Sequence, residues 1–140
     1  MQTSDIISTI SLIVSIVGIP ISYYLGGRNS RNSTYNNAID ELEKLCQKTF
    51  DDAMKIEKST AKNESDYHLM IANHKLLQSK CSQLKNLKNQ TKYPRAELLD
   101  VKKITTDQLF SEDELVQKAA IRNLIYKLVA LTEFYEKKFY

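Results

Sequence analysis

The chain has 140 residues, a formal net charge of +3 and 42% hydrophobic residues, a length that allows one domain or one domain with an appendage. Three glycines and two prolines leave little turn-forming chemistry for a sheet of many strands. Beyond residue 34 the good helix formers Leu, Lys, Glu, Gln and Ala dominate. We therefore predict an all-α fold.

The N-terminal stretch from Ile6 to Leu25 contains no charged residue across its 20 positions. As a helix it would reach roughly 30 Å, which is the thickness of the hydrocarbon layer of a bilayer. A cleaved signal peptide would carry a basic N-terminal region and a shorter apolar core, whereas Met1 to Asp5 include an acid and no base. We expect residues 1–25 to form a single, uncleaved transmembrane anchor helix in the lipid bilayer.

The charges that flank this stretch predict its orientation. Asp5 precedes it, and Arg28 and Arg31 follow it with no acidic residue before Asp40. Positive charge is enriched on the cytoplasmic side of membrane helices. We therefore expect a single-pass protein of the inner (plasma) membrane, with its N-terminus outside and its C-terminal domain in the cytoplasm.

Small residues recur through the predicted span at alternating steps of four and three, and we call them the serine stripe. Its members are Ser4, Ser8, Ser11, Ser15, Gly18 and Ser22. Such a repeat places them on one helix face, where small residues let neighbouring membrane helices approach closely. We predict that the stripe assembles a homo-oligomer. The alternative is that these serines only bond to their own helix backbone.

In a tight dimer or trimer the serine stripe would be dry, whereas a higher oligomer could line a narrow, water-filled pore with it. Pro20 interrupts the same helix, because it lacks the amide hydrogen that would bond to the carbonyl of Ile16. This position is a candidate kink, either a gate or a tolerated bend.

Residues 26–33 break the apolar run and are expected to form a juxtamembrane linker. Residues 34–140 are expected to form a cytosolic bundle of about three long helices. The first, from Thr34 to Thr60, carries a heptad stripe that is either a coiled-coil seam or one wall of a bundle. Additional apolar residues widen this stripe, which favours the bundle. The stripe consists of Tyr35, Ile39, Leu42, Cys46, Thr49, Ala53 and Ile56.

A second helix is predicted from Ser65 to Gln90, and Pro94 either ends it or starts a short helix through Val101. Its apolar stripe is Met70, His74, Leu77, Cys81 and Leu84. We interpret His74 as a hydrogen-bonded core or boundary histidine rather than a ligand. Cys46 and Cys81 belong to no CxxC or Cys/His cluster, so we predict reduced core thiols and no metal site.

The last helix is predicted from Glu112 to Lys138, with a wide apolar arc that suits the centre of a bundle. Ser111 followed by Glu114 matches a capping box, and Phe110 with Leu115 matches a hydrophobic staple around it.

The stretch between Tyr67 and Ala96 contains six basic residues and no acidic one. Within it, Lys85, Lys88, Lys92 and Arg95 form a candidate anion-binding patch. Repeated around an oligomer axis, this patch would concentrate positive potential and could receive a nucleotide, a nucleic acid or an anionic lipid. The alternative is a solvated lysine face.

Motifs of known enzyme classes are not found. The sequence contains no glycine-rich phosphate loop, no HExxH and no GxSxG, and neither histidine follows an arginine at four to six residues. We therefore expect neither an enzyme nor a cofactor.

A short apolar span at residues 6–25 followed by a helical domain resembles the small membrane effectors of prokaryotic antiviral systems, including ancillary membrane proteins of CRISPR loci. The resemblance is one of layout. It implies a cytosolic sensing domain and an oligomer that permeabilises the inner membrane. The leading expectation is thus a homo-oligomeric, pore-forming or membrane-perturbing effector. The alternative is a membrane-anchored adaptor or an immunity or exclusion protein that binds another protein through its helical bundle.

Overall fold

The structure, a computed structural model, describes the backbone of residues 3–88 and 92–138 and the side chains of residues 26–88 and 92–138. All regular structure in these ranges is helical, which confirms the all-α prediction. The elements are α1 (Thr3–Lys58), α2 (Glu64–Lys88), α3 (Arg95–Lys103), the π-helical turn η1 (Ile104–Gln108) and α4 (Glu114–Glu133).

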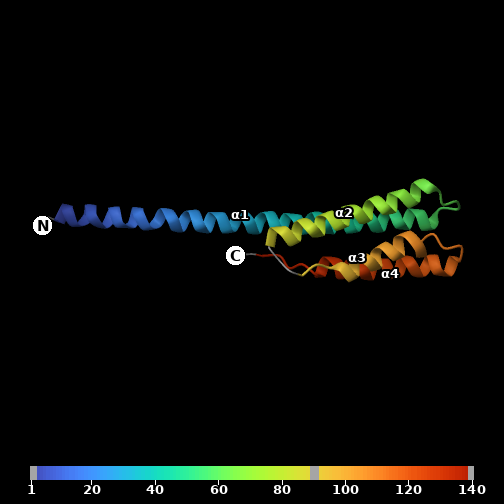
Figure 1. Cartoon of the computed structure of the whole chain (residues 1–140). Coiled ribbons are helices and arrows are strands. Elements are labelled where there is room, and N and C mark those ends of the chain that lie inside the picture. Colours follow the sequence, from blue (N-terminus) through green and yellow to red (C-terminus); the bar gives the residue numbers. More distant parts are fainter. Residues whose placement is uncertain (1–2, 89–91, 139–140) are drawn as a thin grey trace.

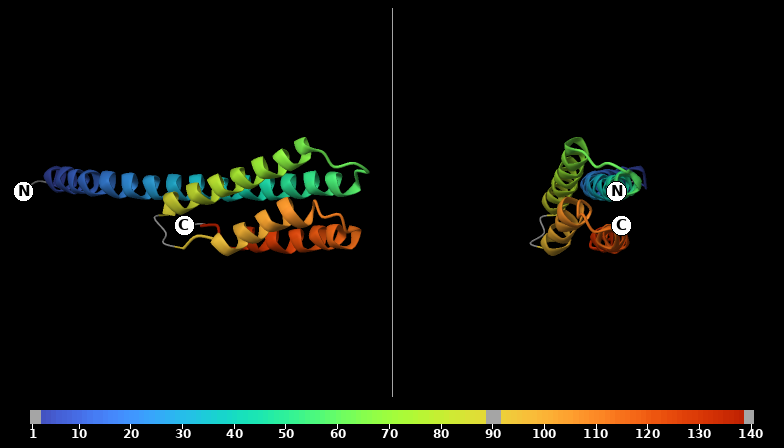
Figure 2. Two further views of the ribbon diagram at one scale, coloured as in Figure 1. Left: turned by 45° about the vertical axis from the view of Figure 1, so that its right-hand side comes forward. Right: turned by 90° about the vertical axis from the view of Figure 1, so that its right-hand side faces the viewer.

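The helices form a two-layer bundle from which the first half of α1 projects as a lone helix (Figure 1). Seen end on in the right panel of Figure 2, α1 and α2 make one layer, and α3 and α4 make the other. The second half of α1 packs against both α2 and α4, and α3 packs against α2 and α4. Two side seams therefore separate the layers, one between α2 and α3 and one between α1 and α4.

The helix α1 passes without a break through residues 26–33, the expected juxtamembrane linker. A Cβ atom added at Gly26 or Gly27 would meet no heavy atom within 4 Å, so both glycines lie on open sides of the helix. The hydroxyl of Thr34 donates to the carbonyl of Ser30 at 3.0 Å and so satisfies its own side chain within the helix. The segment between the predicted span and the bundle is therefore helical.

No helix is long and apolar enough to cross a membrane in the part of the chain whose side chains the structure describes. The predicted span, residues 6–25, lies outside that part, although its backbone belongs to α1. The predicted site residues that fall there are Ser8, Ser11, Ser15, Gly18, Pro20 and Ser22.

The two apolar stripes predicted from the sequence form the core of the bundle. All seven stripe residues of α1, from Tyr35 to Ile56, are buried, and so are all five of α2, from Met70 to Leu84. Fully burying an apolar side chain contributes roughly 1.5–3 kcal/mol. The stripe of α1 is consequently a wall of an intramolecular bundle, as its width predicted.

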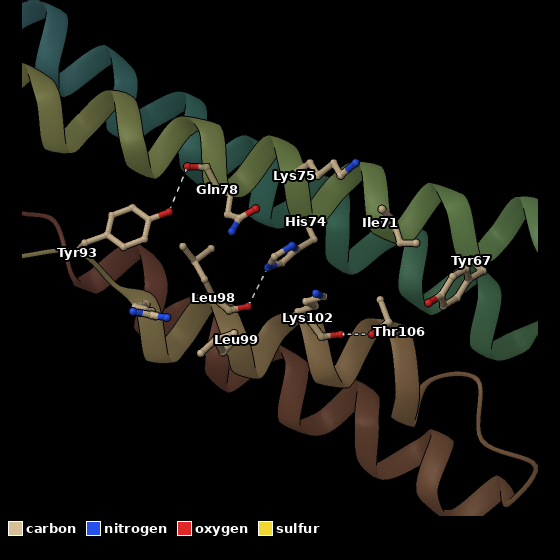
Figure 3. Close-up of a pocket in the computed structure, with 11 residues that line it drawn as sticks. Tyr67, Ile71, His74, Lys75, Gln78, Tyr93, Leu98, Leu99, Lys102 and Thr106 are labelled. Carbon is tan, nitrogen blue, oxygen red and sulfur yellow. Dashed lines mark hydrogen bonds between the residues drawn. The ribbon is translucent and has the colours of Figure 1, made fainter.

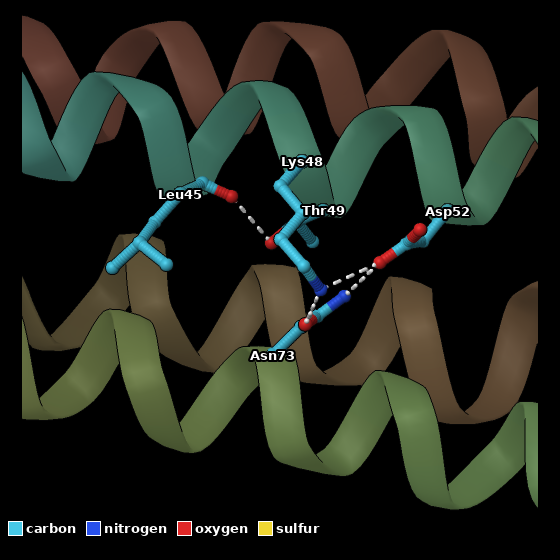
Figure 4. A network of polar contacts seen from close by, with 5 residues as sticks. All are labelled: Leu45, Lys48, Thr49, Asp52 and Asn73. Carbon is cyan, nitrogen blue, oxygen red and sulfur yellow. Dashed lines mark hydrogen bonds and ion pairs between the residues drawn. The ribbon is translucent and has the colours of Figure 1, made fainter.

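A polar network closes the seam between α1 and α2 (Figure 4). Lys48 Nζ donates to Asp52 Oδ2 and to Asn73 Oδ1, both at 3.0 Å, and Asn73 Nδ2 donates to the same Asp52 oxygen at 2.9 Å. Burial raises the pKa of Asp52, but the bonds from Asn73 and Lys48 outweigh it and hold this pKa below its usual value. Each polar group of the network therefore has a partner.

The start of α4 corrects one sequence prediction. Asp113, not Ser111, is the N-cap, because its carboxylate accepts from the amide of Leu115 at 2.9 Å. The Ser111 hydroxyl accepts instead from the Asp113 amide, one step earlier in the loop. Leu115 is 76% exposed, so the predicted staple does not form, and Phe110 packs edge-on against Tyr67. The capping-box prediction was wrong because an aspartate closer to the helix start competes for its amide groups.

The end of α4 also differs from the prediction. The helix stops at Glu133 rather than Lys138, and the following residues return to α1. Asn36 clamps them there, since its Nδ2 donates to the Lys138 carbonyl at 2.6 Å and its Oδ1 accepts from the Lys138 amide at 2.7 Å. The C-terminal segment is thereby attached to α1 near the point where that helix leaves the bundle (Figure 1).

Candidate functional site

A groove of about 610 Å³ runs along the seam between α2 and α3 (Figure 3). Its floor is apolar and is formed by Ile71 of α2 and the buried Leu98 of α3, while the half-exposed Leu99 lines its open wall. Small-molecule sites in proteins typically occupy about 300–1,000 Å³. The groove is therefore large enough for an organic ligand.

His74 bridges the two walls across this floor. Its Nε2 lies 2.9 Å from the Leu98 carbonyl, and because a carbonyl only accepts, Nε2 carries the hydrogen and donates it. Burial lowers the pKa of His74, the bond to Leu98 opposes this effect, and the charge of Lys102 adds to the lowering. The imidazole is consequently neutral at pH 7 and ties α2 to α3, which confirms its interpretation as a hydrogen-bonded core histidine.

Three cationic side chains line the groove, Lys75 from α2 and Arg95 and Lys102 from α3. None of the described residues that line it is acidic. Within the described ranges, no ion pair involves any of the three, whereas Lys80 is paired with Glu41 on the outer surface. The groove is thus lined by three basic side chains that form no ion pair with the acidic residues of the described ranges.

Tyrosines stand at both ends of the groove (Figure 3). Near one end, the Tyr93 hydroxyl donates to the Gln78 carbonyl at 3.5 Å. At the other end, the Tyr67 ring lies 5.5 Å from the ring of Phe110, centroid to centroid, and faces the turn that carries Thr106. An aromatic ring offers a flat apolar face together with a polar edge, so both ends can contact planar groups.

The wall at the Tyr67 end includes the π-helical turn η1. The Leu109 amide donates to the Ile104 carbonyl at 2.9 Å, which is an i to i+5 bond, and the Thr106 hydroxyl donates to the Lys102 carbonyl at 2.7 Å. Single π-helical turns occur frequently at functional sites, because they displace the following side chains relative to a regular helix. Here the turn contributes Thr106 to the groove.

The four residues of the basic patch predicted from the sequence do not lie together in the groove. Of its four members, only Arg95 lines the groove. Lys88 Nζ lies 4.4 Å from the ring centroid of Tyr35 on α1, and Lys85 Nζ lies 5.9 Å from that of Tyr93. Burial and the neighbouring Lys138 lower the pKa of Lys88. Lys92 is exposed.

Sequence reasoning left Lys102 out of the patch. It lies beyond the acid-free stretch, in a segment where Glu97 and Asp100 balance the lysines. Its neighbour across the groove, Lys75, was counted among the six basic residues but not placed in the patch. Of the two lysines, only Lys75 lies in the acid-free stretch that marked a basic surface in the sequence.

A second, apolar groove of about 260 Å³ runs along the opposite seam, between α1 and α4. Phe50 of α1 and Ile125, Leu128 and Val129 of α4 supply its apolar surface. Ile125 and Val129 remain nearly half exposed, so the wide apolar arc predicted for α4 is only partly buried.

Among the described residues, no three His, Cys, Asp or Glu side chains lie close enough together to hold a metal ion. Cys46 and Cys81 are free and buried, and burial raises their thiol pKa values to about 12 and about 11. Comparison of the chain with known protein families, characterised proteins and solved structures finds no match.

Proposed function

We propose that this chain is a homo-oligomeric inner-membrane protein whose helical bundle controls the N-terminal half of α1 in the bilayer. The observation that carries the proposal is the continuity of α1, in which the apolar segment 6–25 and the buried stripe from Tyr35 to Ile56 share one helix. An apolar, uncharged stretch of this length is typical of a membrane span.

A continuous helix couples the two parts mechanically. From residue 25 to residue 58, α1 is roughly 50 Å long at about 1.5 Å per residue. Core contacts with α2 and α4 hold one end of it, and residues 26–33 provide no flexible joint. A change in the tilt or rotation of the bundle would therefore be transmitted to segment 6–25.

The serine stripe supports an oligomer of such segments, and the layout supports an effector that forms a pore or perturbs the membrane. Small residues let membrane helices approach, and their hydroxyls bond between helices or face water. On the resemblance in layout, we assign this activity to antiviral defence. The bundle would then hold the span inactive until it receives a signal.

The test is the oligomeric mass of the full-length protein in detergent. Replacing Ser8, Ser11 and Ser15 by leucine is expected to convert a defined oligomer to monomer and to abolish dye release from liposomes. The matched control replaces Ile6, Ile13 and Val17 by leucine on the opposite face of the same helix, and should keep both. A monomeric parent protein would overturn the proposal.

The apolar groove between α1 and α4 favours a second candidate, a membrane-anchored adaptor. Ile125, Val129 and the more exposed Leu115 give α4 an apolar row that could bind another protein. An adaptor would keep its partner when segment 6–25 is exchanged for an unrelated apolar anchor. The effector would lose membrane activity in the same exchange.

A further inference from the structure

We propose that the basic groove between α2 and α3 is a binding site for a nucleoside phosphate. The inference concerns the bundle alone and goes beyond the membrane function proposed above. It is carried by the juxtaposition of three unpaired cations on two walls with aromatic rings at the ends of an apolar floor.

The charges indicate a phosphate group. Lys75 lines the α2 wall, and Arg95 and Lys102 line the α3 wall, seven residues or roughly 10 Å of helix rise apart. The positive charge is therefore spread along the groove, as a ligand with several phosphate oxygens would require. A guanidinium donates two parallel hydrogen bonds to a phosphate, and an ammonium adds a compact point charge. Three cations without a carboxylate partner favour a ligand with more than one negative charge.

The remaining walls indicate an organic part. A volume of about 610 Å³ is far more than one phosphate group fills. Leu99 is 56% exposed beside the groove, and Tyr93 and Tyr67 present rings at its two ends. A base can stack on a tyrosine while a ribose and its phosphates follow the cations, because every base has a flat π-face.

The polar groups near the floor suit the same ligand. The amide of Gln78 and the hydroxyl of Thr106 line the groove and can donate or accept hydrogen bonds. His74 is engaged with Leu98 and is neutral, so it fixes the spacing of the walls instead of adding charge.

The experiment measures binding of a fluorescent ATP analogue to the full-length protein in detergent, with unlabelled competitors. ATP is expected to compete, adenosine to compete at least about tenfold more weakly because it lacks phosphate, and pyrophosphate likewise because it lacks a base. Equal competition by pyrophosphate would overturn the assignment of a nucleoside. Stronger competition by single-stranded RNA or by anionic lipid vesicles would overturn the nucleoside phosphate in favour of a polyanionic ligand that binds over a larger surface.

Variants test the place of binding. Arg95→Ala and Lys102→Ala are each expected to weaken ATP about tenfold or more, since each removes a charged hydrogen-bond donor. The matched controls Lys92→Ala and Lys103→Ala remove the same charge from exposed positions that do not line the groove, and should change affinity less than about twofold. Equal losses in all four variants would show non-specific attraction and overturn the site.

A last variant separates the base from the phosphate. Tyr93→Leu should weaken ATP while leaving pyrophosphate competition unchanged, because the ring that stacks on the base is lost. The matched control Tyr93→Phe loses only the hydroxyl that bonds to the Gln78 carbonyl, and should keep the affinity for ATP. Circular dichroism of each variant shows whether the bundle is folded. Unchanged affinity of a folded Tyr93→Leu protein for ATP would contradict the aromatic contact. These binding measurements do not depend on the oligomeric mass, so they can fail without affecting the membrane proposal.

Discussion

The two sides of α2 treat charge in opposite ways. Toward α1, Asn73 is 2% exposed and is bonded to both Lys48 and Asp52, so the polar groups of that seam satisfy one another. Toward α3, Lys75 lines a groove together with Arg95 and Lys102, and no acidic residue is among the described lining residues. Paired charges on one side hold the helices together, whereas the basic side chains on the other form no ion pair within the described ranges.

The acidic residues of α3 explain the difference. Asp100 pairs with Lys127 of α4 at 2.9 Å, and this bond, with a weaker effect of Glu97, raises the pKa of Lys127. The Asp100 carboxylate therefore lies toward α4, the other helix of its layer, while Arg95 and Lys102 line the groove. A helix with nearly balanced charge becomes one-sided when its acids and bases occupy different faces.

The largest effect on stability is expected from truncating a core side chain of α2. Leu77 is fully buried, and Leu77→Ala is expected to lower the free energy of unfolding by about 2–5 kcal/mol, through lost burial and the cavity left behind. Leu99→Ala, the same change at a half-exposed groove position, should alter it by less than about 0.5 kcal/mol. Urea unfolding followed by circular dichroism measures both, and equal losses would contradict the assignment of Leu99 to an open wall.

A smaller effect is expected from the polar groups themselves. Asn73→Ala should lower the free energy of unfolding by about 1–3 kcal/mol, because Lys48 and Asp52 lose a buried partner. Lys75→Ala, about 3 Å of helix rise away but lining the groove, should stay within about 0.5 kcal/mol of the parent. If the Lys75 variant were as destabilised as the Asn73 variant, the charge in the groove would be structural.

The smallest effect is a pH dependence that arises from His74. The pKa of His74 is lowered from 6.5 in the folded protein. Between the folded pKa and the unfolded value of 6.5, the unfolded chain therefore binds more protons than the folded one. The free energy of unfolding should therefore fall as the pH drops below about 6.5, by at most about 1.4 kcal/mol per pH unit. The carboxylates with lowered pKa values, Asp52 and Glu41, act at lower pH.

His74→Gln keeps a side-chain donor for the Leu98 carbonyl and removes the titration. The free energy of unfolding, measured at pH 7.5, 6.5 and 5.5, should change less with pH in this variant than in the parent. An unchanged slope would assign the pH dependence to other groups.

Much of the fold follows from local periodicity. The stripes of α1 and α2 were predictable because residues at steps of three and four share a helix face whatever packs against it. The same reasoning overstated α4, where Ile125 and Val129 stay nearly half exposed, because a wide arc does not reveal how much of it a neighbour covers. The cap at Asp113 was missed because Ser111 and Asp113, two residues apart, are both favoured N-cap types.

By itself, the sequence determined the helical class, the buried faces of α1 and α2, the core role of His74, and the excess of base over acid in α2. These properties depend on composition and spacing within one element. Only the tertiary structure decided that Lys102 joins Lys75, and that Lys88 lies over Tyr35 instead of facing the groove. The rotation of each helix about its axis decides such contacts, and that rotation is set by packing across the whole bundle.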